Sequence, residues 1–311
     1  MASKTTPWNV SHLPDLAGRT AVVTGANSGL GLATVDALAR AGAHVVLAVR
    51  DPRRGEAAAA TVTGVRGTLE VRRLDLADLA SIREFAAAWQ GDLDLLINNA
   101  GVMNLPESST KDGFEMQFGT NHLGHFALTN LLLPHITDRV VTVSSNAHKM
   151  AGSPRMHFEN LNLTGEYDPV TAYGQSKLAN LLFTLELQRR LTHAGSPVRA
   201  MAAHPGWSST NLQNNNANPF IRAFGHFINR FFAQDSTAGA LPTLYAAVKD
   251  LPGASYVGPD GRGEWRGNPT LVGRSSNASD PDTARRLWTA SEQLTGTTFP
   301  RHLHATTQAQ P

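Results

Sequence analysis

The chain has 311 residues, of which 41% are hydrophobic and 17% are charged, and its formal net charge is only +2. This balance fits one globular α/β protein with a sizeable core and offers no basic surface for nucleic acid. The chain has no cysteine, which excludes disulfides and thiolate metal sites. It shows no signal sequence and no transmembrane-length apolar run, so we expect a cytoplasmic protein without a transmembrane segment.

Short runs rich in valine and leucine alternate with longer helical patterns along the chain. We expect strands at 19–25, 43–50, 68–76, 93–101, 139–145, 198–206 and 254–261, and helices at 30–42, 53–62, 79–90, 114–136 and 171–193. Buried strands that alternate with helices predict a doubly wound parallel α/β sheet in a single domain over residues 18–300. Residues 1–17 are expected to form an N-terminal extension, disordered over its first ~15 residues, and 301–311 a disordered tail.

A glycine-rich segment, "TGANSGLG" at residues 24–31, lies between the first expected strand and helix. Glycine there lets the backbone turn tightly and approach a pyrophosphate that rests on the helix N-terminus. The alternative is a glycine-rich turn that binds no ligand. We predict a dinucleotide-binding turn formed by Gly25, Asn27, Ser28, Gly29, Leu30 and Gly31.

The end of the second expected strand bears on which dinucleotide binds. Chains that bind NAD usually place an acid there for the ribose hydroxyls, whereas this chain has Val49 followed by Arg50. A guanidinium at this place favours the 2′-phosphate of NADP(H), which is therefore the preferred cofactor. Asp51 leaves NAD(H) open, because it could serve as the ribose acid.

Tyr173 and Lys177 stand one helical turn apart in "YGQSKLANLLF", so both side chains leave the same helix face. Four other motifs accompany them, each beside an expected strand or helix: "NNAG" at 98–101, "NHLGH" at 121–125, "VTVSS" at 141–145 and "HPG" at 204–206. In this order, the motifs resemble the short-chain dehydrogenase/reductase family over residues 18–260. They look most like its branch of retinol dehydrogenases and bacterial relatives.

The resemblance implies a Rossmann-type fold and a catalytic tetrad of Asn121, Ser145, Tyr173 and Lys177. Ser145 is chosen over Ser144 because the family motif uses the second serine of such a pair. The resemblance also extends the cofactor contacts to Asp75, Leu76, Asn99, Ala100, Gly101, Tyr173, Lys177, Pro205, Gly206 and Thr210.

The tetrad implies acid–base chemistry at a carbonyl. A carbonyl that accepts hydride builds negative charge on its oxygen, so a positioned acid must deliver a proton. We expect Lys177 and the bound oxidised cofactor to lower the pKa of Tyr173 from its ordinary value of about 10. Ser145 would orient the carbonyl oxygen, and Asn121 would hold a water that links Lys177 to solvent.

Two segments outside these motifs bear on the substrate. The stretch between Ser145 and Tyr173 is expected to form a loop by the substrate mouth, where His148, Met150 and Met156 either line the mouth or are surface residues. Residues 207–235 are expected to be a variable substrate lid. The phenylalanine stripe on its helix at 218–232 is expected either to pack on the core or to cover an apolar substrate. The third alternative is that the helix docks on a membrane surface through its basic face.

These expectations combine into an NADP(H)-dependent oxidoreductase that interconverts a carbonyl and an alcohol on a lipophilic small molecule. The alternatives are a reductase of C=C bonds and a non-catalytic NADP-sensing or scaffold protein. No metal is expected, because His122 and His125 lack a third ligand at a suitable spacing. Helices 114–136 and 171–193 pair in many dimers of the family, and their leucine content permits a homodimer.

Overall fold

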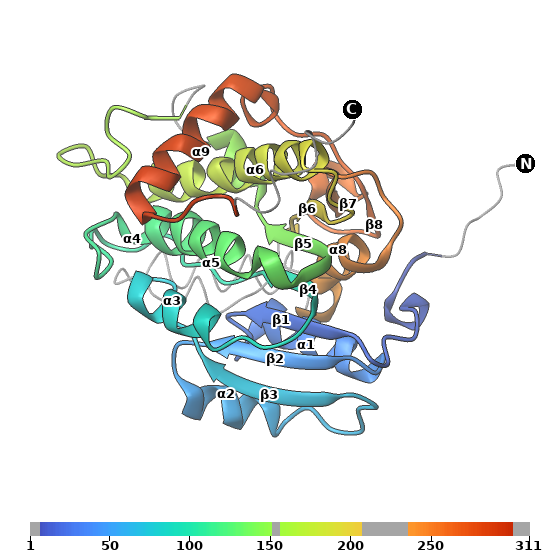
Figure 1. Ribbon diagram of the computed structural model, residues 1–311. Coiled ribbons are helices and arrows are strands. Elements are labelled where there is room, and N and C mark those ends of the chain that lie inside the picture. Colours follow the sequence, from blue (N-terminus) through green and yellow to red (C-terminus); the bar gives the residue numbers. More distant parts are fainter. Residues whose placement is uncertain (1–6, 151–155, 207–235, 301–311) are drawn as a thin grey trace, which may run out of the picture.

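A single eight-stranded sheet organises the computed structural model, which describes residues 7–150, 156–206 and 236–300 (Figure 1). Its strands are β1 (Thr20–Thr24), β2 (His44–Val49), β3 (Thr68–Arg73), β4 (Leu93–Asn98), β5 (Ile136–Val143), β6 (Arg199–Ala203), β7 (Tyr256–Pro259) and β8 (Pro269–Leu271). They lie in the order β3-β2-β1-β4-β5-β6-β7-β8. All neighbours are parallel except β8, which runs antiparallel to β7.

Helices cover both faces of this sheet (Figure 1). One layer holds α1 (Gly29–Arg40), α2 (Pro52–Ala59) and α8 (Ser236–Val248), and the other holds α3 (Leu79–Ala87), α5 (Gly124–Leu132) and α6 (Pro169–His193). A further helix, α9 (Pro281–Thr295), packs on α6. Among the described residues, no helix combines the length and apolarity that a membrane span requires.

Helices pack on both faces of the sheet because the side chains of each strand alternate between two cores. In β1, Val22 contacts the core under α3, α5 and α6, while Ala21 and Val23 contact the core under α1 and α8. All three side chains are fully buried, as a sheet covered on both faces requires. The predicted doubly wound α/β fold is confirmed.

The N-terminal extension differs from its expected disorder. The Trp8 ring meets the Tyr245 ring of α8 edge-on, with centroids 5.2 Å apart. Leu13 and Leu16 also pack against the core under α1 and α8. Disorder was therefore the wrong expectation for residues 7–15, because three apolar side chains anchor the segment to the domain.

The helix expected at 114–136 is a composite. It starts as α4 (Met116–Phe118), widens into a π-helical turn over Gly119–Leu123, continues as α5 and ends in a 3₁₀ turn over Leu133–His135. A π turn inside a helix is rare and often lies at a functional site. Here it contains Asn121, one of the predicted catalytic residues.

Candidate active site

A pocket opens where the strand order reverses, beyond the carboxyl ends of β1 and β4. This is where doubly wound sheets bind ligands. The predicted cofactor residues that line it are Gly25, Asn27, Ser28, Gly29, Leu30, Gly31, Arg50, Asp75, Leu76, Asn99, Ala100 and Gly101. The pocket is also lined by five residues that were not predicted from the sequence: Ala48, Leu74, Ala77, Val102 and Thr120. Most of these stand within two residues of a predicted one, so strand-end position was the available signal.

The glycine turn leaves no room for side chains. Gly25 has φ +65° and Gly29 φ +55°, values that L-residues rarely adopt. A Cβ on Gly31 would lie 2.6 Å from the Gly25 carbonyl oxygen and 2.7 Å from Asn99 Nδ2. The bare backbone therefore lets a ligand approach closely.

The N-terminus of α1 is open to an anion. The helices α2, α3, α6 and α9 each begin with an aspartate that caps backbone N–H groups: Asp51, Asp78, Asp168 and Asp280. At α1 the N-cap is Ser28, whose side chain makes no capping hydrogen bond in the described part of the chain. Free N–H groups and the helix dipole suit a pyrophosphate, so the turn fits the dinucleotide that the sequence implies.

The side chains after β2 take separate roles. Arg50 is exposed and lines the pocket. The Asp51 carboxylate instead accepts hydrogen bonds from the backbone N–H groups of Arg53 at 3.0 Å and Arg54 at 3.4 Å. It therefore caps α2, while the neighbouring guanidinium faces the ligand space.

Ser145 and Tyr173 meet beside the end of β5. The Ser145 hydroxyl lies close enough to the Tyr173 phenol to lower the pKa of that phenol. Ser144 is only 2% exposed, and its hydroxyl donates to the Lys177 carbonyl oxygen at 2.8 Å. The two serines thus differ: Ser144 secures α6 to β5, and Ser145 is the one that contacts the phenol.

Lys177 is buried beneath the pocket wall. Its Nζ donates to the Val143 carbonyl oxygen at 3.1 Å and lies 5.6 Å from the centroid of the Tyr173 ring. A Cβ on Gly101 would be 3.4 Å from this Nζ and 3.3 Å from Asn121 Oδ1. The ammonium therefore stands directly behind a backbone segment that faces the pocket.

Burial sets the proton affinities of this pair. It raises the pKa of Tyr173 to about 12, and the nearby Ser145 hydroxyl only partly opposes this rise. It also lowers the pKa of Lys177 to about 8. The expected lowering of the Tyr173 pKa includes the charge of the bound oxidised cofactor, so it stays a prediction.

Hydrogen bonds of its side chain hold Asn121 in place. Its Oδ1 accepts from the Val102 backbone N–H at 2.8 Å, and its Nδ2 donates to the Val102 carbonyl oxygen and to Ser176 Oγ, both at 2.9 Å. These bonds hold the π turn against the pocket wall. The Asn121 side chain thus positions two segments relative to each other.

The "HPG" motif follows β6, beside β5. Gly206 has φ +69°, and a Cβ there would lie 2.4 Å from the Trp265 carbonyl oxygen. Pro205 and Gly206 are partly exposed at the carboxyl edge of the sheet, and neither is among the residues that line the pocket. Thr210 and the expected lid at 207–235 lie outside the described residues, as does the tail at 301–311.

The loop after Ser145 is more buried than a surface loop. His148 is 2% exposed, and its Nδ1 donates to the Ser145 carbonyl oxygen at 2.7 Å. Met156 is 5% exposed and belongs to the core under α3, α5 and α6. Neither is a surface residue, so that alternative was wrong for both, and His148 braces the backbone of Ser145.

Comparison with known proteins gives the same assignment. A family profile described as short chain dehydrogenase matches residues 19–158. Mouse retinol dehydrogenase 14 is 40% identical over 300 residues, covering 90% of this chain and 86% of that protein. Human retinol dehydrogenase 13 is 42% identical over 297 residues, covering 91% and 86%. The crystal structure of an uncharacterized protein from Mycobacterium paratuberculosis shares 56% identity with a TM-score of 0.82, covering 95% of this chain and 100% of that one.

The family uses NAD(P)(H) and a small-molecule substrate. Identity of about 40% across nine-tenths of the chain establishes common descent. The chain therefore belongs to the short-chain dehydrogenase/reductase family, in its retinol dehydrogenase-like branch, and is an oxidoreductase that acts on CH–OH and C=O groups.

Proposed function

We propose that the protein is an NADP(H)-dependent oxidoreductase that interconverts a carbonyl and an alcohol on a lipophilic small molecule, with Tyr173 as general acid and base. The observation that carries this proposal is the cluster of Tyr173, Ser145 and Lys177, whose ammonium lies behind Gly101 in the wall of the glycine-lined pocket. Bound NADP(H) supplies or accepts the hydride. The protein side chains supply the proton and the orientation.

In the reductive direction, Tyr173 is the proton donor. A pKa of about 12 keeps its phenol protonated at neutral pH, so the proton is in place when charge develops on the carbonyl oxygen. Ser145, in contact with the phenol, donates a second hydrogen bond to that oxygen. Lys177, with a pKa of about 8, is mostly cationic at pH 7 and stabilises the phenolate left behind.

NADP(H) is proposed over NAD(H) because of the residues after β2. Arg50 lines the pocket, and a guanidinium recognises a 2′-phosphate by charge and by paired hydrogen bonds. The carboxylate that would recognise ribose hydroxyls, that of Asp51, is engaged in capping α2. The lipophilic substrate class rests on the relatives whose names refer to retinol.

A panel of carbonyls and alcohols, followed at 340 nm with NADPH and NADH in parallel, tests the proposal. We expect apolar ketones or aldehydes to be reduced with NADPH, and the matching alcohols to be oxidised. Reduction of enones at the C=C bond alone would favour the C=C reductase. Cofactor binding without turnover across the panel would favour a sensing or scaffold protein.

The variant Tyr173→Phe tests the proton donor. We expect kcat to fall by about 10²–10⁴-fold, because proton transfer by a positioned side chain contributes that much. The Kd for NADPH, measured by fluorescence titration, should change little. Tyr245→Phe on α8, whose ring packs on Trp8, is the matched control and should keep wild-type kcat. Substantial activity in Tyr173→Phe would remove Tyr173 from the mechanism.

A further inference from the structure

Both ring nitrogens of His125 make hydrogen bonds, and their partners belong to two different parts of the site. Nε2 lies 2.9 Å from Thr24 Oγ1, at the end of β1. Nδ1 lies 2.9 Å from the carbonyl oxygen of Asn121, in the π turn. The ring is 1% exposed, so water does not compete for either contact. His125 thus joins the start of the glycine turn to the helix that carries Asn121.

The partners fix where each hydrogen lies. A carbonyl oxygen only accepts, so Nδ1 carries the hydrogen and donates to Asn121. Nε2 is then the unprotonated nitrogen, and it accepts from the Thr24 hydroxyl. That hydroxyl has a second acceptor, the Ile97 carbonyl oxygen, but at a longer distance of 3.4 Å. One neutral tautomer therefore satisfies the whole bridge.

Thr24 extends the bridge to the pocket wall. Its Oγ1 accepts from the backbone N–H groups of Asn99 and Ala100, each at 2.9 Å. Its carbonyl oxygen accepts from Asn99 Nδ2 at 2.8 Å. One hydroxyl thus receives two bonds from the wall and gives one to His125, which uses its full hydrogen-bonding capacity.

The helix geometry explains why a histidine can do this. His125 stands four residues after Asn121, and a regular α-helix would pair the Asn121 carbonyl with the backbone N–H of residue 125. In the π turn, a backbone hydrogen bond joins residues five apart instead of four, as the bond from the Gly124 N–H to the Gly119 carbonyl shows. The side chain of His125, rather than a surface water, donates to the Asn121 carbonyl.

We propose that His125 is a positioning residue that holds the π turn of Asn121 in register with the cofactor wall at Asn99 and Ala100. This role rests on the proposed function, because it matters only if the wall holds the cofactor and the helix holds the proton donor. The Asn121 side chain bonds Val102 and Ser176, and Ser176 adjoins Lys177. A shift of the π turn would therefore move the ammonium and the wall relative to each other.

A neutral ring suits this role. Burial, with a smaller contribution from the Lys177 charge, lowers the pKa of His125 to about 4. A second proton on Nε2 would break the bond from Thr24 and put two cations together in the core. The bridge therefore stays intact over the pH range in which the enzyme would work.

The test uses half-replacements at His125. An asparagine amide can retain the Nδ1 contact with the Asn121 carbonyl, and a glutamine amide can retain the Nε2 contact with Thr24. We expect His125→Asn and His125→Gln each to lower kcat about 10–100-fold with NADPH, because the bridge needs both ends. The Kd for NADPH should stay within about threefold of wild type, because Thr24 can still accept from the backbone N–H groups of Asn99 and Ala100.

His122 provides a matched control on the same turn. It is also 1% exposed, and burial lowers its pKa to about 3, but its Nε2 bonds Ser291 Oγ on α9 at 2.9 Å, away from the pocket. His122→Asn and His122→Gln should lower Tm and leave kcat within about threefold of wild type. If the role of His125 were purely structural, its variants would likewise lower Tm and leave kcat within about threefold of wild type.

The outcomes separate the two proposals. Turnover by the wild type, together with His125 variants that keep wild-type kcat, would overturn the positioning role alone. A wild type that turns over no member of the panel would refute the proposed function, and the positioning role would fall with it. If a His125 variant does not fold, Thr24→Val, which removes the hydroxyl and keeps the shape, takes its place with the same expected loss of kcat. An unchanged kcat in Thr24→Val would likewise overturn the positioning role.

Discussion

Tyr173 is half-buried and Lys177 is buried, and desolvation opposes charge on either side chain. Burial raises one pKa to about 12 and lowers the other to about 8, so the resting pair is a neutral phenol beside a mostly protonated amine. This state is ready to donate a proton. Oxidation of an alcohol must first draw a proton from the phenol, so it should gain more than reduction from a rise in pH.

Arg50 is the residue on which cofactor choice depends. We expect Arg50→Ala to raise KM for NADPH about 10–100-fold, because a charge-assisted bond to phosphate contributes about 1.5–3 kcal/mol. KM for NADH should stay within about twofold of wild type, since NADH has no 2′-phosphate. Initial rates with each cofactor measure both constants.

The control for Arg50 is Arg54→Ala on the exposed surface of α2, outside the pocket. It removes the same charge a few residues away. Equal losses in the two variants would show that the effect is one of overall charge, and would count against a phosphate contact at Arg50.

Four buried histidines of the described residues should make the fold sensitive to acid: His122, His125, His148 and His204. Burial lowers the pKa of His148 below its ordinary value. Burial lowers the pKa of His122 and His204 to about 3 and that of His125 to about 4. Below pH 6.5 the unfolded chain binds protons at these rings while the folded chain does not, so the free energy of unfolding falls as pH falls. Each ring contributes up to about 1.4 kcal/mol per pH unit until its folded pKa is reached.

Urea unfolding at pH 7.5, 6 and 5 measures this dependence. We expect a progressive loss of unfolding free energy below pH 6.5. In His122→Gln the free energy of unfolding should fall less steeply as pH falls. The variant lacks one imidazole that binds a proton in the unfolded chain but not in the folded chain. An unfolding free energy that stays level between pH 7 and 5 would contradict the burial of neutral rings.

At the scale of the elements, α2 offers a test of what Asp51 does. A capping carboxylate contributes about 1 kcal/mol, so Asp51→Ala should lower the free energy of unfolding by about that amount. Asp51→Asn, which keeps the capping oxygen, should keep the stability. KM for NADH should be the same in both variants. A rise in that constant with both would instead identify Asp51 as a ribose ligand.

The order of strands and helices was predictable from the sequence, whereas the roles of single polar residues were less so. Buried runs such as β1 and β4 carry valine and leucine on both faces, which only a covered parallel strand tolerates. Asp51 was ambiguous, because the residue types that cap helices also bind ribose. The π turn around Asn121 depends on contacts with Val102 and Thr24, which lie far away in sequence.

Some missed elements did carry a local signal. An aspartate followed by proline precedes three helices, at Asp51, Asp168 and Asp280, and the last of these marks the start of α9. Aspartate is a favoured N-cap and proline a favoured first helical residue. The strand β8 had no such signal: it has three residues and begins with a proline, so only its pairing with β7 defines it.

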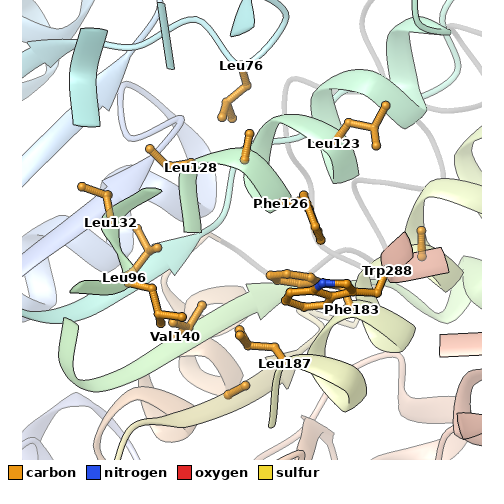
Figure 2. Close-up of a cluster of buried hydrophobic side chains, with 14 of the residues drawn as sticks. Leu76, Leu96, Leu123, Phe126, Leu128, Leu132, Val140, Phe183, Leu187 and Trp288 are labelled. Atoms are coloured by element: carbon orange, nitrogen blue, oxygen red, sulfur yellow. The ribbon is translucent and has the colours of Figure 1, made fainter. Parts of the chain in front are cut away.

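For the molecule as a whole, α9 covers the groove between α5 and α6. The Trp288 ring stacks on Phe183 with centroids 5.8 Å apart and meets Phe126 edge-on at 4.8 Å, an arrangement that Figure 2 shows. Arg190 lies over the indole at 4.4 Å, and the indole N–H donates to Glu292. The apolar side chains Phe126 of α5 and Phe183 of α6 are therefore packed against this chain's own helix.

We accordingly expect a monomer in solution. Light scattering after size-exclusion chromatography should give the mass of one 33.3 kDa chain. Trp288→Ala should lower the free energy of unfolding by about 3–5 kcal/mol, since the ring is 1% exposed among apolar neighbours, and should raise the tendency to self-associate. A wild-type mass of two chains would contradict the prediction.

The covering helix also bears on how the chain is made. Phe126 and Phe183 leave the ribosome long before Trp288, and they belong to a core that is closed only when the last hundred residues have followed. During synthesis the nascent protein must carry an open apolar cleft, the kind of surface that molecular chaperones hold. Completion of the domain therefore waits for the final helix, although the nucleotide-binding half was finished much earlier.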